Sequence, residues 1–306
     1  MSSLPELVDT HCHIQSAANP AGETATRELW AQDSGMTGDL LVQNAVQRGV
    51  TKFICVGCDY LDSQLAINFV KSRANCWASI GLHPHEAKHY AHNQAKLDDF
   101  AKLASAPKVV AVGECGLDYF YGHSPRADQF TILKYQIELA LKLNLPLIFH
   151  VREAFDDFWP IFDSYHTSGQ KVRGVVHSFT DNRANLDKAL ERGLYIGVNG
   201  IATFAKNPAQ LEVYRSIPLS NLLLETDAPY LTPTPYRGSI NEPRHVLTVA
   251  NFLTELRNED FSTFATATTG NAQTLFSCGC EPSPRITAAR TIHSGLAQRL
   301  CAGGRI

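Results

Sequence analysis

The 306-residue chain lacks a strong net charge and long apolar runs. Its formal charge is -3, from 27 lysine and arginine residues against 30 aspartate and glutamate residues. This balance argues against a protein that coats nucleic acid, although an enzyme that handles one strand end needs only local positive charge. No apolar run reaches the roughly 18 residues of a membrane span, and the first residues lack a basic segment followed by an apolar core. We therefore expect a cytoplasmic protein with no membrane partner.

The sequence also lacks the cysteine pattern of a disulfide-rich domain. Its eight cysteines are scattered, and Cys55 and Cys76 lie inside apolar runs, so we expect reduced thiols. Hydrophobic residues make up 44% of the chain and charged residues 19%, which is an ordinary globular balance. Because α/β barrels of roughly 250 residues commonly form one domain, we expect a single domain over residues 1–277. The apolar pattern fades beyond it, so residues 278–306 are predicted to be a peripheral or disordered tail.

Eight short apolar runs recur along the chain, each followed by a polar turn and a longer helical pattern. Continuous apolar runs are typical of strands that are covered on both faces, and intervening helices supply the crossovers that parallel pairing requires. An open doubly wound sheet would carry a glycine-rich phosphate loop after its first strand, and this sequence has none. We therefore predict an α/β fold of the (β/α)8 TIM-barrel type. The predicted strands are 7–10, 52–56, 77–80, 109–112, 147–149, 174–176, 194–198 and 222–224.

Two connections between the strands are distinctive. Residues 129–143 carry apolar side chains near a 3.6-residue period and predict a helix that Pro146 stops. Residues 15–38 form a long first connection, with a short helix expected around Trp30, and would overhang the C-terminal face of the barrel. That face holds the catalytic residues in barrels of this kind.

Imidazoles and carboxylates follow the predicted strands. His11 and His13 are two residues apart on one strand, so their side chains project to the same face and could bind one divalent cation. Glu114 has two oxygens and could bridge two metals about 3.5 to 4 Å apart. His150 and His177 would complete the second metal site. Taken singly, each histidine is better explained as a core or surface imidazole, but five candidate ligands at strand ends make coincidence a poor explanation.

Asp227 follows the last predicted strand and has two candidate roles in a metal site. It could bind the first metal and accept a proton from a metal-activated water. The alternative is a helix cap before Pro229, which would involve no chemistry. The mixed imidazole and carboxylate set suits zinc, manganese or iron and does not exclude magnesium. We therefore expect two divalent cations of unassigned identity.

Together these segments resemble the TatD family of metal-dependent deoxyribonucleases, within the amidohydrolase superfamily, over residues 7–276. The matching segments are 9–13, 81–85, 113–118, 150–152, 177–179, 225–231, 241–243 and 270–272. The resemblance implies a (β/α)8 barrel that hydrolyses DNA phosphodiesters from a 3′ end. It also implies divalent cations held by His11, His13, Glu114, His150, His177 and Asp227.

The same resemblance implies three substrate contacts. His83 would touch the scissile phosphate and stabilise its developing charge, and Arg152 would clamp the anion. The alternative for Arg152 is an ion pair with an acidic residue at position 153, 156 or 157. Glu242 lies in a segment that looks like the family's Arg-Asn-Glu-Pro motif, although Ile240 stands where the arginine is usual.

Three functions remain open from the sequence. The first is a phosphodiesterase acting on DNA ends, with RNA as a further substrate. The second is a metal-dependent esterase or amidohydrolase, for example one that cleaves aminoacyl esters on transfer RNA. The third is a non-catalytic scaffold, against which the complete ligand set argues. No heptad or exposed apolar helix indicates an interface, so we expect a monomer.

Overall fold

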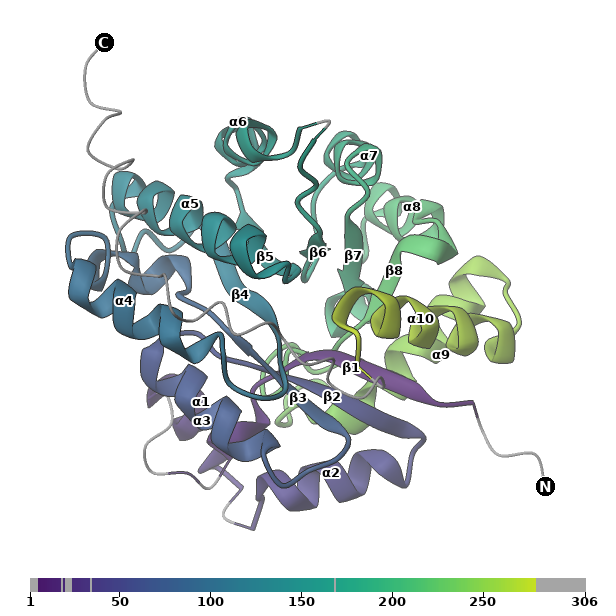
Figure 1. Cartoon of the computed structure of the whole chain (residues 1–306). Coiled ribbons are helices and arrows are strands. Elements are labelled where there is room, and N and C mark those ends of the chain that lie inside the picture. Colours follow the sequence, from purple (N-terminus) through teal and green to yellow (C-terminus); the bar gives the residue numbers. More distant parts are fainter. Residues whose placement is uncertain (1–4, 18, 20–23, 34, 168, 279–306) are drawn as a thin grey trace.

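The eight predicted strands all form, and they build a single parallel sheet that curls into a barrel inside a ring of helices (Figure 1). The computed structural model describes residues 5–17, 19, 24–33, 35–167 and 169–278. The strands follow one another in chain order around the sheet. They are β1 (Leu7–Cys12), β2 (Val50–Val56), β3 (Cys76–Ile80), β4 (Val109–Asp118), β5 (Leu147–Arg152), β6 (Gly174–Val176), β7 (Tyr195–Val198) and β8 (Leu222–Leu224).

The barrel closes where the first strand meets the segment that follows the last one. The Thr10 hydroxyl donates to the Leu224 carbonyl over 3.0 Å. Beyond β8, Cys12 pairs with Ala228 in a parallel bridge, and the Asp227 amide donates to the His11 carbonyl over 2.8 Å. The prediction of a (β/α)8 TIM barrel is therefore confirmed.

Helices cover the outside of the sheet, as parallel crossovers require. The predicted helix at 129–143 is confirmed, but it starts three residues earlier, directly after Pro125, and ends where Asn144 adopts left-handed backbone. The helices are α1 (Thr24–Trp30), α2 (Gly38–Val46), α3 (Tyr60–Val70), α4 (Gln94–Leu103), α5 (Arg126–Leu143), α6 (Phe155–Tyr165), α7 (Arg183–Glu191), α8 (Pro208–Ser216), α9 (Val246–Arg257) and α10 (Phe261–Phe276). None of the described helices is long and apolar enough to cross a membrane.

The barrel interior is closed at one end by the last helix. Side chains from most of the strands, including Val8, Ile54 and Ile148, form a buried cluster with Phe276 of α10 and with Cys278. A larger cluster lies between the strands and the surrounding helices. Cys278, the first residue of the predicted tail, is thus packed into the barrel, and residues 279–306 lie outside the described part of the chain.

β4 is the strand that differs most from the bounds predicted from the sequence. β4 continues past Val112 to Asp118, and its pairing with β5 shifts between Val112 and Cys115, so Glu114 lies within an irregular strand rather than after its end. In the long first connection, the short helix predicted around Trp30 is confirmed as α1. The Trp30 indole is buried and donates to the His13 carbonyl over 3.2 Å, which ties this connection to the end of β1.

Candidate metal centre

The first and last strands bring two histidines and an aspartate together. The His13 Nε2 atom lies 3.2 Å from Asp227 Oδ1, and His11 Nε2 lies 3.5 Å from the same oxygen. Asp227 is held by its own amide, which bonds to the His11 carbonyl. No helix begins between residues 228 and 242, so the alternative of Asp227 as a helix cap has no helix to cap. These three side chains form one group that could hold a cation.

Glu114 lies between two sets of imidazoles. Its Oε2 atom is 3.4 Å from His11 Nε2, whereas Oε1 is 2.8 Å from His150 Nδ1 and 2.9 Å from His177 Nε2. Burial raises the pKa of Glu114, but the surrounding imidazoles outweigh this effect and hold the pKa well below its usual range. An ionised carboxylate with one oxygen facing each imidazole set has the arrangement expected of a bridging ligand.

Gly81 makes room for Glu114. A Cβ atom added at Gly81 would lie 2.2 Å from the Glu114 backbone nitrogen, far inside van der Waals contact. The backbone after β3 can therefore approach β4 closely only because residue 81 has no side chain.

The hydrogen bonds of His13 and His150 leave one ring nitrogen of each free to face a carboxylate. The His13 Nδ1–H donates to the Val56 carbonyl over 2.9 Å, which leaves the Nε2 lone pair towards Asp227. The His150 Nε2–H donates to Asp118 Oδ2 over 2.9 Å, which leaves the Nδ1 lone pair towards Glu114. Neutral imidazoles oriented by a second hydrogen bond are the usual state of histidine ligands.

His11 provides an independent test of whether these residues suit a metal. Its side chain is fully buried, and neither ring nitrogen has a hydrogen-bond partner. Its ring stacks on His177 with centroids 4.0 Å apart. An unsatisfied buried imidazole is costly unless a ligand completes it. Because carboxylate oxygens and other imidazoles surround it, the residues present fit divalent cations.

Protons compete with a cation for these lone pairs. Although burial lowers the pKa of His13, Asp227 and the other nearby carboxylates raise it to about 9. A cation that binds His13 must displace that proton, as metal binding to histidine generally does.

The three residues predicted to contact the substrate lie in three different environments. His83 lies beside the cluster, with Nε2 3.5 Å from Glu114 Oε1. Arg152 is exposed at the end of β5, and its guanidinium lies over the Phe120 ring at 4.0 Å rather than against an acidic residue. Glu242 is buried, and its Oε1 is 2.5 Å from Arg244 Nη2, so its carboxylate is already paired within the chain.

Three residues of the cluster were given no role from the sequence. Asp118 accepts from His150, and Glu225 Oε1 lies 3.5 Å from His177 Nδ1. Cys58 Sγ lies 3.7 Å from Glu114 Oε2 and forms a further candidate group with His13 and Glu114. Cys58 stands two residues after β2, so an inspection of every strand end would have found it.

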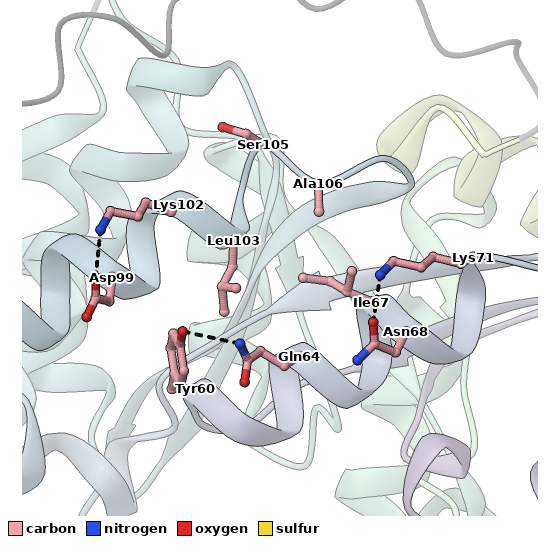
Figure 2. Close-up of a pocket in the computed structure, with 10 residues that line it drawn as sticks. All are labelled: Tyr60, Gln64, Ile67, Asn68, Lys71, Asp99, Lys102, Leu103, Ser105 and Ala106. Carbon is pink, nitrogen blue, oxygen red and sulfur yellow. Dashed lines mark hydrogen bonds and ion pairs between the residues drawn. The ribbon is translucent and has the colours of Figure 1, made fainter.

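A surface groove of about 450 Å³ lies away from this cluster, between α3 and α4 (Figure 2). The charged groups on its rim are satisfied locally: Lys71 donates to Asn68 and Lys102 donates to Asp99, each over 2.7 Å. None of its lining residues belongs to the candidate metal groups. The strand-end cluster therefore remains the candidate site.

Comparison with known proteins agrees with the fold and identifies the family. Residues 8–277 match the family described as TatD related DNase. The "Uncharacterized metal-dependent hydrolase YabD" of Bacillus subtilis is 33% identical, with 88% of this chain and 98% of that protein covered. The "3'-5' ssDNA/RNA exonuclease TatD" of Escherichia coli is also 33% identical, with 83% and 97% covered.

A solved structure gives the same result. The crystal structure of YJJV, a TatD homolog from Escherichia coli, superposes with a TM-score of 0.76 at 30% identity, covering 89% of this chain and 98% of that one. A phosphotriesterase homology protein from the same organism is 15% identical with a TM-score of 0.55, and it shares the fold alone. The chain therefore belongs to the TatD family of metal-dependent hydrolases.

Proposed function

We propose that this hydrolase cleaves phosphodiester bonds of nucleic acid with two divalent cations, as a deoxyribonuclease that removes nucleotides from a 3′ end. The observation that carries the proposal is the position of Glu114, with Oε2 towards His11 and Oε1 towards His150 and His177. His11, His13 and Asp227 would hold one cation, His150 and His177 the other, and Glu114 both. Cations bound there would polarise a phosphoryl oxygen and acidify the attacking water.

The protein's own residues supply the proton transfer and the contacts to phosphate. Asp227 accepts the proton of the attacking water, because its carboxylate already faces the place where a cation would bind. Burial lowers the pKa of His83 to about 4, so its ring is neutral. Because His83 Nδ1 accepts from the His85 amide, Nε2 carries the hydrogen and can donate it to a phosphate oxygen.

The choice of nucleic acid follows from the relatives. The matched family is described as a DNase, and several relatives at about one-third identity are named as 3′-5′ exonucleases of single-stranded DNA and RNA. DNA ends are therefore the first substrate to test, and RNA ends the second. The exposed Arg152 guanidinium supplies local positive charge in a chain whose net charge is only -3.

The test is hydrolysis of single-stranded DNA that carries a label at the 5′ end. Wild-type protein is assayed with chelator and then with magnesium, manganese or zinc restored. Glu114→Ala is assayed in parallel, and Glu212→Ala, which removes an exposed carboxylate on α8, is the matched control. We expect stepwise shortening from the 3′ end only when metal is present, with Glu114→Ala inactive and Glu212→Ala unchanged.

Two results would contradict the proposal. Absence of cleavage of DNA and RNA with every metal would leave a metal-dependent hydrolase of another substrate, and aminoacyl esters and amides would then be assayed. Full activity of Glu114→Ala would contradict the bridging role. Metal analysis of the purified variant checks that role without any assay of activity, because loss of a bridging ligand should lower occupancy at both positions.

A further inference from the structure

Two large aromatic side chains lie exposed directly after β4. Phe120 is 53% exposed and Tyr121 52%, although most large apolar side chains in the described part of the chain are buried. Exposed aromatic rings next to an active site are typical of surfaces that bind a flat ligand by stacking.

One carboxylate connects these rings to the candidate metal centre. The Oδ1 atom of Asp118 accepts from the amides of Phe120 and Tyr121, both over 3.0 Å. Its Oδ2 atom accepts from His150 Nε2 over 2.9 Å. The aromatic pair is thereby held at a fixed position relative to a candidate metal ligand.

The same surface carries a positive charge and further rings. The Arg152 guanidinium lies 4.0 Å from the centre of the Phe120 ring and 4.9 Å from that of Tyr121. The Tyr121 ring is nearly parallel to His123, with an angle of 7° and centroids 5.6 Å apart. Stacked rings combined with a guanidinium match the chemistry of single-stranded nucleic acid, which presents flat bases along an anionic backbone.

We propose that Phe120, Tyr121 and Arg152 form a stacking platform that receives an unpaired base beside the bond to be cleaved. The platform deepens the proposed function and depends on it for the identity of the ligand. The Phe120 and Tyr121 rings stand at 88° to each other, so a base stacks on one ring and meets the edge of the other while Arg152 faces the adjoining phosphate. Because a base inside a duplex is already stacked and paired, the platform favours ends that are single-stranded or frayed.

The test compares two oligonucleotides that differ only in their bases. One is a short single-stranded deoxyoligonucleotide with a fluorescent 5′ end, and the other has abasic residues at its last three 3′ positions. Binding to the Asp227→Asn protein with manganese is followed by fluorescence anisotropy, so that hydrolysis does not consume the probe. The platform variant adds Phe120→Leu and Tyr121→Leu, which keep apolar bulk and remove the rings. The matched control adds Val46→Ala, which trims an exposed apolar side chain on α2.

We expect the base-bearing oligonucleotide to bind about 5- to 150-fold more tightly than the abasic one, the range given by stacking of one base. The platform variant should lose this preference, and the Val46→Ala control should keep it. Tyr121→Phe, which keeps the ring, should also retain most of it. Circular dichroism and thermal unfolding confirm that the platform variant is folded.

The results separate the platform from the proposed function. Equal affinity for the two oligonucleotides, or a preference that survives in the platform variant, overturns the platform even if the wild-type protein degrades DNA. Preferential binding that depends on the rings supports the platform even if no nucleic acid is hydrolysed, in which case the proposed function fails. Failure of the Asp227→Asn protein to bind either oligonucleotide also overturns the platform.

Discussion

Replacing Asp118 with alanine should weaken metal binding although Asp118 is not a candidate ligand. The carboxylate accepts the Nε2–H of His150 and so turns the Nδ1 lone pair towards Glu114. Without this acceptor, the imidazole can adopt the other tautomer or rotate. Loss of such a partner of a histidine ligand typically costs 10- to 100-fold in metal affinity, or about 1.4 to 2.8 kcal/mol.

The assay is isothermal titration calorimetry, in which zinc or manganese is added to the metal-free protein. The matched control is Asp128→Ala, because Asp128 also pairs with an imidazole, His92, over 2.9 Å, but has no place in the candidate metal groups. Asp118→Ala should lose affinity at one of two sites, and Asp128→Ala should lose none. If Asp118→Ala bound both equivalents of metal as tightly as the wild type, His150 would not depend on this carboxylate and the reasoning would be refuted.

The other predictions concern turnover, pH and packing. Asp227→Asn should lower kcat by about 100-fold or more with little change in KM, because it removes the general base and leaves the phosphate contacts in place. Steady-state kinetics on an oligonucleotide measure both constants. An unchanged kcat would exclude the role assigned to Asp227. Burial and neighbouring guanidinium groups lower the pKa of His245 to about 4. Below pH 6.5 the unfolded chain therefore binds more protons at this residue than the folded protein does. The free energy of unfolding should fall towards pH 4, by at most about 3 kcal/mol. Urea unfolding at pH 7 and pH 5 should show a smaller pH dependence for His245→Asn than for the wild type. Gly81→Ala should destabilise the fold by about 1–3 kcal/mol and reduce metal content, because the added Cβ atom would clash with the backbone of Glu114. Gly270→Ala in α10 is the control. A Cβ atom added there has nothing within 4 Å, so this substitution should not destabilise the fold.

The sequence predicts the barrel well because each strand is a continuous apolar run bounded by polar turns. Where polar residues continue a strand, the prediction stops too early. β4 was predicted to end at Val112 but extends to Asp118, because its second half carries the side chains of the site and is held by pairing with β5. Periodicity cannot indicate such a segment, since its pairing depends on residues more than thirty positions away.

The candidate ligands could be predicted because they lie in or just after the C-terminal parts of strands that must meet at one face. Their partners could not. The hydrogen bond between Asp118 and His150 and the pairing of Glu242 with Arg244 depend on side-chain directions that only the folded backbone sets. The position of Arg152 over Phe120 is a further example, because the sequence suggested a phosphate clamp or, as the alternative, an ion pair with an acidic neighbour.

The contact between β1 and the segment after β8 also determines when, during synthesis, the candidate site can be complete. His11 and His13 are made at the start of synthesis, whereas Asp227 follows the last strand and is joined to them only when that strand completes the ring. A growing chain that ends before β8 carries two of the three side chains of this group and lacks the third. The bonds between β1 and the segment after β8 also place these side chains, so metal binding at this position would require the whole barrel to be made and folded. Partly made chains thus lack the complete set of these three candidate ligands.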